Sequence, residues 1–238
     1  MTNLLKFPMK TSISPEFAEI LSRQIISEKT PGSILRDFET VLNFIITDRP
    51  GLTEKGNLLP LKALPKINND LTFPLKFDLK RPGHGSYPNI TGLYLLIRAA
   101  GLSYVERTLT AHTKIVPDEE VCMSWHRLNL TERYFTLLET WLFKAKPEIL
   151  KQDRTFETNL NRWFVFFANV PSIGVNFSST RKYEYLFSHS SGLYTITLME
   201  MFGLIYVRHR NPEKGKKWRP ESISTSAKVL HHNLYSVP

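Results

Sequence analysis

The sequence contains a single cysteine, Cys122, among its 238 residues. One thiol cannot build an intramolecular disulfide framework, which excludes a small disulfide-stapled scaffold and suits a reducing cytoplasm. No apolar run approaches the roughly 18–20 residues that a transmembrane helix needs, and Met1–Lys10 lacks both a sustained apolar stretch and a small-residue cleavage site. We therefore expect a folded cytoplasmic protein without a membrane partner.

Motifs for catalytic or metal chemistry are also missing. The sequence has neither the G-x-S-x-G of a nucleophile elbow nor the G-x-x-x-x-G-K-[ST] of a phosphate-binding loop. Gly83-His84-Gly85 lacks a third glycine and is expected to be a turn. Cys122 and His126 have a spacing that could face one metal, but zinc needs three or four ligands and no second pair has suitable spacing. The sequence thus predicts a protein that is not an enzyme, with no catalytic residues, metal site or cofactor.

Two N-terminal stretches have the apolar spacing of helices. The first is predicted to begin at Ser14, an N-cap before Pro15, and to end at Pro31-Gly32. Ser33 can then cap a second helix whose apolar stripe is expected to face the core. The stripe comprises Ile34, Phe38, Val41, Leu42, Ile45 and Ile46, and the opposite, polar side is expected to hold Arg36, Asp37, Glu39 and Thr40.

The most informative feature is an internal repeat. Gly92-Leu93-Tyr94 opens an apolar segment that ends at Gly101, and Gly192-Leu193-Tyr194 opens another that ends at Gly203. In each copy the second glycine stands where a helix needs a left-handed residue, and a β-prone triplet follows it. The sequence therefore predicts a helix, a tight stop and a strand, used twice.

A hairpin is predicted after the second copy. Residues 208–219 are polar and contain turn signals, and Lys217-Trp218-Arg219 is expected to be the returning strand. A short helix is expected to start at Ser224 or Thr225. Helix, strand, hairpin and helix is the order of a winged-helix unit. After the first copy, residues 106–113 are expected to form a weaker wing.

We therefore expect a mainly α protein built from two winged-helix-like halves, with small β-hairpin wings as the only sheet. The predicted limits are an N-terminal helix at 1–32, a first half at 33–148 and a second half at 149–238. Two more helices are expected in the first half, one opened by Pro117-Asp118 and one with a capping box formed by Asn129 and Glu132.

Positive charge is concentrated near the second predicted wing. The chain has a formal net charge of +9, and residues 204–238 hold seven basic residues against two acidic ones. A basic wing can contact phosphates, so the backbone of DNA or RNA is an expected partner. The predicted nucleic-acid-binding residues are Arg208, Arg210, Lys214, Lys216, Lys217, Trp218 and Arg219 in the wing, with Lys80 and Arg81 in the connection before the first repeat helix.

Alternatives remain open for this wing. Its lysines could simply keep a solvated hairpin soluble, and Trp218 could either pack beneath the hairpin or touch sugar. The preceding helix argues against base reading, because 193–202 carry no cation and few polar groups to offer to base edges. The second hypothesis is a protein-interaction or scaffolding module that uses the apolar repeat helices to bind another protein.

Aromatic residues are dense between Phe156 and Phe187. A stacking platform for single-stranded nucleic acid would need such rings exposed beside a basic groove. Residues 163–167 form a nearly continuous apolar run, which favours packing in the core.

Four stretches of the sequence carry a family resemblance: Leu79–Pro82, Ser86–Leu102, Trp125 and Leu128–Leu142. They resemble an uncharacterised helical region that accompanies the Ri-plasmid ORF-3-like domain, a family also labelled as a passenger of an insertion element. The resemblance spans roughly Leu35 to Leu230 and implies an association with mobile elements, without assigning an activity or a binding residue. A separate ORF-3-like domain would be expected to begin at Pro238. The chain is then a fragment, or the partner of a separately encoded ORF-3-like domain, or a region that works alone.

Overall fold

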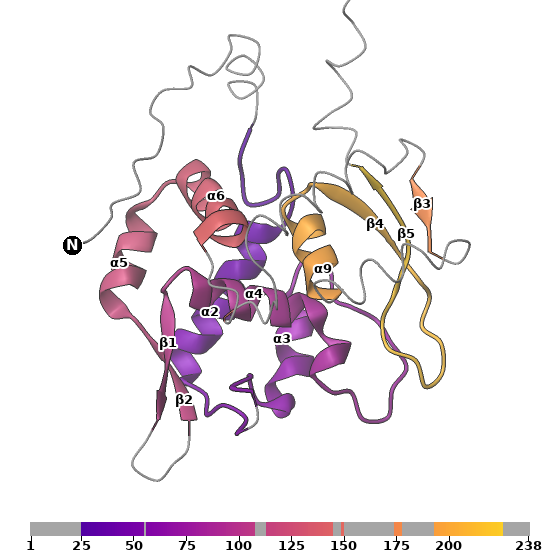
Figure 1. Ribbon diagram of the computed structural model, residues 1–238, viewed down its shortest axis with the longest axis horizontal. Coiled ribbons are helices and arrows are strands. Elements are labelled where there is room, and N and C mark those ends of the chain that lie inside the picture. Colours follow the sequence, from indigo (N-terminus) through magenta and orange to yellow (C-terminus); the bar gives the residue numbers. More distant parts are fainter. Residues whose placement is uncertain are drawn as a thin grey trace, which may run out of the picture.

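A computed structural model describes residues 25–54, 56–107, 113–144, 149, 174–177 and 193–225. This part of the chain is mainly helical and contains two small antiparallel sheets (Figure 1). The expected helical class with small β-hairpins is therefore confirmed. Most of the helix predicted from Ser14 to Pro31-Gly32, most of the aromatic segment and the residues after 225 lie outside the described residues. The end of that predicted helix is described and the prediction is wrong there: residues 25–32 are not helical, and the backbones of Ser27 and Thr30 hydrogen-bond to each other as in a turn.

In the described part of the chain, three α-helices precede the first hairpin, two follow it, and a last α-helix leads into the second hairpin. The α-helices are α2 (Ile34–Asp48), α3 (Leu64–Asp70), α4 (Pro88–Ala99), α5 (Glu119–Arg127), α6 (Leu130–Glu139) and α9 (Leu193–Met201). Short 3-10 turns lie at Leu61–Ala63 and His84–Ser86, and a π-helical turn at Thr140–Lys144 continues α6. The strands are β1 (Ser103–Arg107), β2 (Thr113–Pro117), β3 (Val175–Asn176), β4 (Ile205–His209) and β5 (Pro220–Thr225). The predicted turn at Gly83-His84-Gly85 is thus observed.

Helix α2 lies where the sequence predicts it and buries most of its apolar stripe, but the side chain of Ser33 does not form the expected cap, because its hydroxyl donates to Asp37 instead. One residue departs from the expected pattern: Asp37, predicted on the polar side, is only 1% exposed. Its carboxylate accepts hydrogen bonds from Ser33 Oγ at 2.7 Å and from the backbone nitrogen and hydroxyl of Thr72, both at 2.7 Å. Burial of this carboxylate is possible because these donors replace water. Asp37 thereby ties the start of α2 to the loop after α3.

The repeat is present as predicted. Helix α4 ends before Gly101 and α9 ends before Gly203, and both glycines have positive φ angles, 77° and 72°. An L-residue with a side chain rarely adopts this conformation, which explains why a glycine stands at each stop. Strands β1 and β4 follow directly.

The two repeat helices pack against each other in one hydrophobic core. Gly92 of α4 allows the close approach, because a Cβ at this position would lie 2.9 Å from Cγ of Leu198 on α9. Residues 93–97 and 194–199 are all buried. The copies therefore share a core, while the predicted domain limits remain a prediction.

Each copy continues into an antiparallel hairpin, and the two hairpins lie on opposite sides of the helical core (Figure 1). In the second, β5 pairs with β4 and also with the short β3, so this sheet has three strands and not only the expected hairpin. The returning strand, predicted at Lys217–Arg219, is found at Pro220–Thr225, where buried Ile223 lies opposite Val207. This apolar pair sets the register and leaves 210–219 as a long connection. The helix predicted to start at Ser224 or Thr225 is wrong for these two residues, which belong to β5.

The two helices after the first hairpin begin with the expected caps. The Asp118 carboxylate accepts from the Val121 backbone at the start of α5, and Asn129 and Glu132 form the predicted capping box of α6. These bonds satisfy backbone N–H groups that the first helical turn leaves free. In the described part of the chain, no helix is both long and apolar enough to cross a bilayer.

Candidate nucleic-acid interface

Strand β4 presents alternate residues to the core and to solvent. Ile205 and Val207 are buried, while Tyr206 and Arg208 are exposed on the opposite face. The two-residue period of a strand places Tyr206 and Arg208 on the same side. This face forms one wall of a groove.

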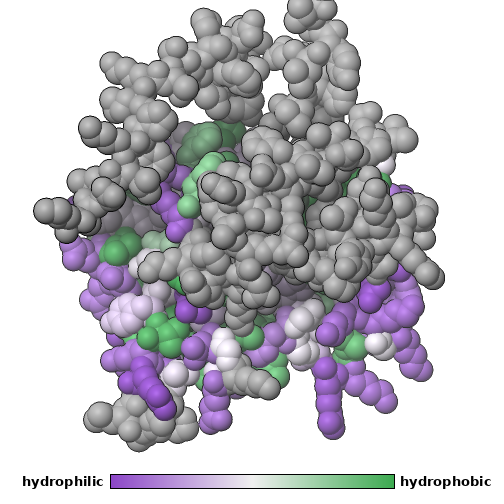
Figure 2. Space-filling model, in the orientation of Figure 1, coloured by the Kyte–Doolittle hydropathy of each residue, from purple (hydrophilic) through white to green (hydrophobic). Residues whose placement is uncertain are grey.

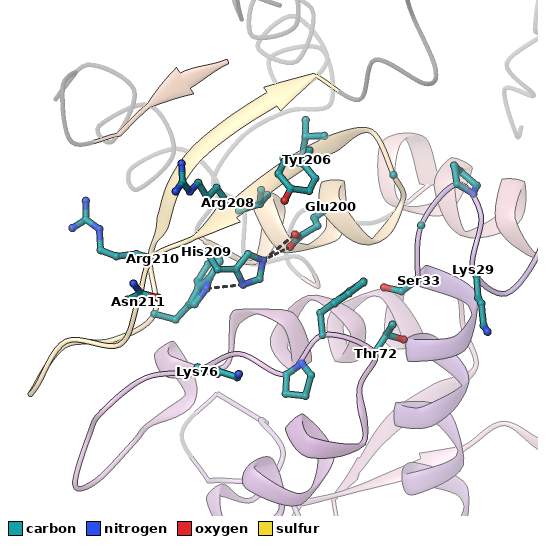
Figure 3. Close-up of a pocket in the computed structure, with 18 of the residues that line it drawn as sticks. Lys29, Ser33, Thr72, Lys76, Glu200, Tyr206, Arg208, His209, Arg210 and Asn211 are labelled. Atoms are coloured by element: carbon teal, nitrogen blue, oxygen red, sulfur yellow. Dashed lines mark hydrogen bonds and ion pairs between the residues drawn. The ribbon is translucent and has the colours of Figure 1, made fainter. Parts of the chain in front are cut away.

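The root of the hairpin is held by a chain of three side chains. The indole Nε1–H of Trp218 donates to Nδ1 of His209 at 3.3 Å. Nδ1 is then an acceptor, so the ring proton is on Nε2, which donates to Glu200 on α9 at 2.9 Å. Figure 3 shows the contact between His209 and Glu200. Because both ring nitrogens of His209 have partners, neither is available as a general base.

Trp218 packs beneath the hairpin, which is one of the two expected alternatives. It is 2% exposed, and its ring meets His209 edge-on with centroids 5.4 Å apart. A buried indole has almost no surface to offer to a sugar. Trp218 was an expected nucleic-acid contact; its burial gives it a structural role instead.

The end of the hairpin contacts the connection that precedes α4. The backbone N–H of Gly215 donates to the carbonyl of Asp78 at 2.8 Å, and Asp78 and Lys214 form an isolated parallel bridge. Lys80 and Arg81, both exposed, follow Asp78 by two and three residues. The structure thus brings the segment that carries these predicted residues next to the hairpin, although Asp78 and Lys214 are 136 residues apart in sequence.

Two cavities of about 790 and 510 Å³ lie along the hairpin and share part of their lining. Five residues line both cavities: Lys76, Arg210, Asn211, Pro212 and Trp218. The larger cavity lies between β4 and two segments of the first part of the chain, 28–33 and 72–76 (Figure 3). We call the combined space the basic groove.

The lining of the basic groove is predominantly positive. Its charged residues are Lys29, Lys76, Arg208, Arg210, Lys216, Lys217 and Arg219, against Glu28, Glu200 and Glu213. Two of the three carboxylates are already engaged: Glu200 by His209, and Glu213 by Lys216 and Arg210. In the described ranges, no carboxylate forms an ion pair with Lys76 or Lys217. Lys76 and Lys217 are therefore available to bind an anion in the groove.

Most of the predicted site residues meet at this groove. Arg208, Arg210, Lys216, Lys217 and Arg219 line it, and Lys214 is exposed at the tip of the hairpin. Hydrophilic side chains gather over the end of this hairpin, on the right of Figure 2. Arg208 also forms an ion pair with Glu221 at 3.1 Å, so part of its charge is already balanced.

Sequence reasoning did not assign Lys29, Phe73, Lys76 or Tyr206 to the site, although all four line the groove. The alternation Ile205-Tyr206-Val207-Arg208 contained a usable signal for Tyr206, because it places the tyrosine beside Arg208 on the outer face. Lys29, Phe73 and Lys76 come from segments far from the hairpin in sequence. No local sequence pattern indicates that these three residues face the hairpin.

Among the described residues, no group of three histidine, cysteine or acidic side chains could hold a metal ion. Cys122 is buried, and its Sγ–H donates to the Leu102 carbonyl at 3.5 Å. Burial, and then the charges of Asp118, Glu39 and Glu119, raise the pKa of this thiol. It therefore stays neutral and is a poor metal ligand or nucleophile.

No protein family model, curated protein or solved structure matches this chain. The function must therefore be argued from the residues of the basic groove. Their common property is excess positive charge at a wide, partly open surface, which is the chemistry of anion binding.

Proposed function

We propose that this protein is a non-enzymatic module that binds the phosphate backbone of nucleic acid in the basic groove, largely independently of sequence. The observation that supports it is the lining of the groove, where seven basic residues face three carboxylates. Each phosphate that such a surface neutralises releases condensed counterions, which provides sequence-independent affinity.

Burial of helix α9 supports the sequence-independent character of this binding. Residues 194–199 are buried against α4 and the rest of the core. A helix that reads bases must instead place polar side chains in the major groove. Contacts to phosphate from the hairpin are therefore a better fit than recognition of an operator sequence.

In this proposal the β4–β5 hairpin acts as the wing of a winged-helix-like unit. The order of α9, the Gly203 stop and the hairpin supports that description, as does its repetition in α4, Gly101 and β1–β2. The resemblance to the helical region that accompanies the ORF-3-like domain adds a proposed association with mobile elements. A cytoplasmic location is part of the same proposal.

The alternative, a scaffold that binds another protein through the apolar repeat helices, has less support. Helices α4 and α9 bury their apolar residues against each other, with Leu93, Leu95 and Leu198 fully buried. Helices that already cover each other have little apolar surface left for a partner.

The proposal is tested by reversing charge in the groove. The triple variant Lys216→Glu, Lys217→Glu, Arg219→Glu should lower affinity for DNA at low salt by at least about 100-fold, and reduce the slope of log K against log salt by about 2 to 3. The matched control is Lys62→Glu, Lys66→Glu, Arg107→Glu. It changes net charge equally at exposed positions that do not line the groove.

Fluorescence anisotropy with a labelled oligonucleotide, over a series of salt concentrations, measures both quantities. We expect the control triple to retain most of the wild-type affinity. Equal losses in the two triples would show that only net charge matters and would contradict a groove. Unchanged binding in the groove triple would contradict the proposal altogether.

A further inference from the structure

Two large aromatic rings are exposed in the basic groove. Tyr206 of β4 is 66% exposed and Phe73, in the loop after α3, is 61% exposed. Both line the larger cavity, which places them in the same space. Neither ring has an aromatic or hydrogen-bonding partner among the described residues. Open rings beside cations are the two components of a surface that stacks unpaired bases.

The strand register keeps the Tyr206 ring open. Its neighbour across the hairpin is Ser224, and the neighbour of Arg208 is Ser222. A serine is too small to cover an aromatic ring on the adjacent strand. The outer face of the hairpin therefore exposes the Tyr206 ring and the Arg208 side chain on β4, with only serines opposite them on β5.

The position of Phe73 is fixed from the other side of the groove. The preceding residue, Thr72, donates both its backbone N–H and its hydroxyl to the buried carboxylate of Asp37. Pro74 follows and restricts the backbone further. Phe73 is thus held in a loop with few accessible conformations, which reduces the entropy lost when a ligand contacts it.

Each ring has a cation close to it in the sequence, and both cations line the same cavity as the rings. Arg208 is two residues from Tyr206 on the same face of β4, and Lys76 is three residues from Phe73 in the opposite wall (Figure 3). A nucleotide stacked on either ring would thus have a basic side chain within reach of its phosphate. Duplex DNA can meet the cations but cannot meet the rings, because its bases are stacked on one another.

We infer that the basic groove selects single-stranded over duplex nucleic acid by stacking unpaired bases on Tyr206 and Phe73. This inference rests on the proposed function, since the cations provide the shared affinity for phosphate. Stacking on an aromatic side chain contributes about 5- to 100-fold in affinity per base. The rings therefore provide the preference for single strands over duplexes, and the cations provide the affinity for nucleic acid of either form.

The chain contains its own matched control for Tyr206. Tyr104 occupies the equivalent position in the first copy of the repeat and is 51% exposed on β1. Its neighbour across the hairpin is Val116, and it lines neither cavity of the basic groove. Tyr206→Ala and Tyr104→Ala each remove an exposed tyrosine from the same position of a strand. The two variants differ only in the surroundings of the tyrosine that is removed.

The experiment measures binding of the full chain to two probes by fluorescence anisotropy. One is a labelled oligothymidylate of about 12 nucleotides, within the site sizes that such grooves have. The other is a hairpin duplex with the same number of phosphates. We expect wild-type protein to prefer the single strand at least tenfold. Tyr206→Ala with Phe73→Ala should abolish that preference and leave duplex affinity and the salt slope unchanged, while Tyr104→Ala should behave as wild type.

Several outcomes would overturn the inference. Equal wild-type affinity for the two probes, or equal effects of Tyr206→Ala and Tyr104→Ala, would remove the stacking platform and leave backbone binding intact. Failure of both probes to bind, or tighter binding of a polyglutamate peptide, would instead contradict the proposed function as well. If the double alanine variant does not fold, Tyr206→Leu with Phe73→Leu keeps apolar volume without a π face, and should lose the single-strand preference in the same way.

Discussion

The two hairpins of the repeat have the same origin in the chain but different surroundings. Each follows a helix and a left-handed glycine, and each exposes a tyrosine at the second position of its first strand. In the first hairpin Glu106 and Lys114 pair across the strands at 2.8 Å. Residues 205–225 of the second carry six basic and two acidic residues. The repeat thus supplies a common frame, and only the second copy places it beside a basic groove.

The glycine stops differ in the same way. A Cβ on Gly101 would meet nothing within 4 Å, whereas a Cβ on Gly203 would lie 2.4 Å from the carbonyl oxygen of Pro31. The segment 28–33 that crowds Gly203 also lines the groove. Segment 28–33 therefore packs closely against Gly203 where it lines the groove, whereas Gly101 has no such close neighbour.

The largest expected effect comes from replacing these two glycines. Gly101→Ala should cost about 1–2 kcal/mol of unfolding free energy, because alanine disfavours a positive φ. Gly203→Ala should cost more than about 3 kcal/mol, because the same strain is joined by a clash with backbone that cannot move aside cheaply. Urea unfolding measures both. Equal losses would contradict the close packing of segment 28–33 on Gly203.

Trp218 tests whether the second hairpin is anchored from within. Trp218→Phe removes the donor to His209 and should lower the unfolding free energy by about 1 kcal/mol. Oligonucleotide affinity should stay within about twofold, because a buried indole does not touch the ligand. Loss of binding at unchanged stability would instead restore Trp218 as a contact residue.

The carboxylates of the two hairpins provide a smaller and more specific test. A hydrogen bond from Lys216, followed by its charge, holds the pKa of Glu213 below its usual value. Glu213 therefore stays ionised at neutral pH and competes with phosphate for Lys216. Glu213→Gln should tighten oligonucleotide binding about two- to threefold at low salt, and the effect should fade as salt rises.

The matched change in the first hairpin is Glu106→Gln, which releases Lys114. We expect it to leave the dissociation constant unchanged, since Lys114 lines neither cavity. A gain in affinity equal to that of Glu213→Gln would mean that the two hairpins are equivalent in binding.

The smallest expected effect concerns Cys122, which lies on α5, directly after the first hairpin. Burial raises the pKa of its thiol, so the folded chain holds this proton to a higher pH than the unfolded chain does. Its contribution to stability is complete below the pKa of the unfolded thiol and is lost as pH rises through the folded pKa. Unfolding free energy should therefore decline in mildly alkaline solution, less steeply in Cys122→Ala. Identical slopes would contradict burial of the thiol.

Local patterns were sufficient for much of the fold. The stops at Gly101 and Gly203 and the caps at Asp118 and Asn129 are satisfied by atoms within a few residues, so their sequence signals are complete. Asp37 was expected in solvent because the helical pattern contains no information about Thr72, its partner 35 residues away. The shift of the returning strand has a similar cause: the pairing of Ile223 with Val207 overrides the turn signals.

The candidate site was predictable only in part for the same reason. Charge counting found the hairpin cations, since they are adjacent in sequence. The opposite wall, with Phe73 and Lys76, is brought to the hairpin by the packing of α4 against α9 and by the contact of Gly215 with Asp78. Such contacts depend on the whole core, and no short segment encodes them.

The most direct test is amide hydrogen exchange of the full chain with and without a saturating oligothymidylate. If the second hairpin and its facing loop bind the backbone, peptides that cover 72–77 and 205–219 should exchange more slowly with ligand, while those that cover 103–117 should not change. Equal protection of both hairpins, or protection confined to the first, would contradict a nucleic-acid site in the basic groove.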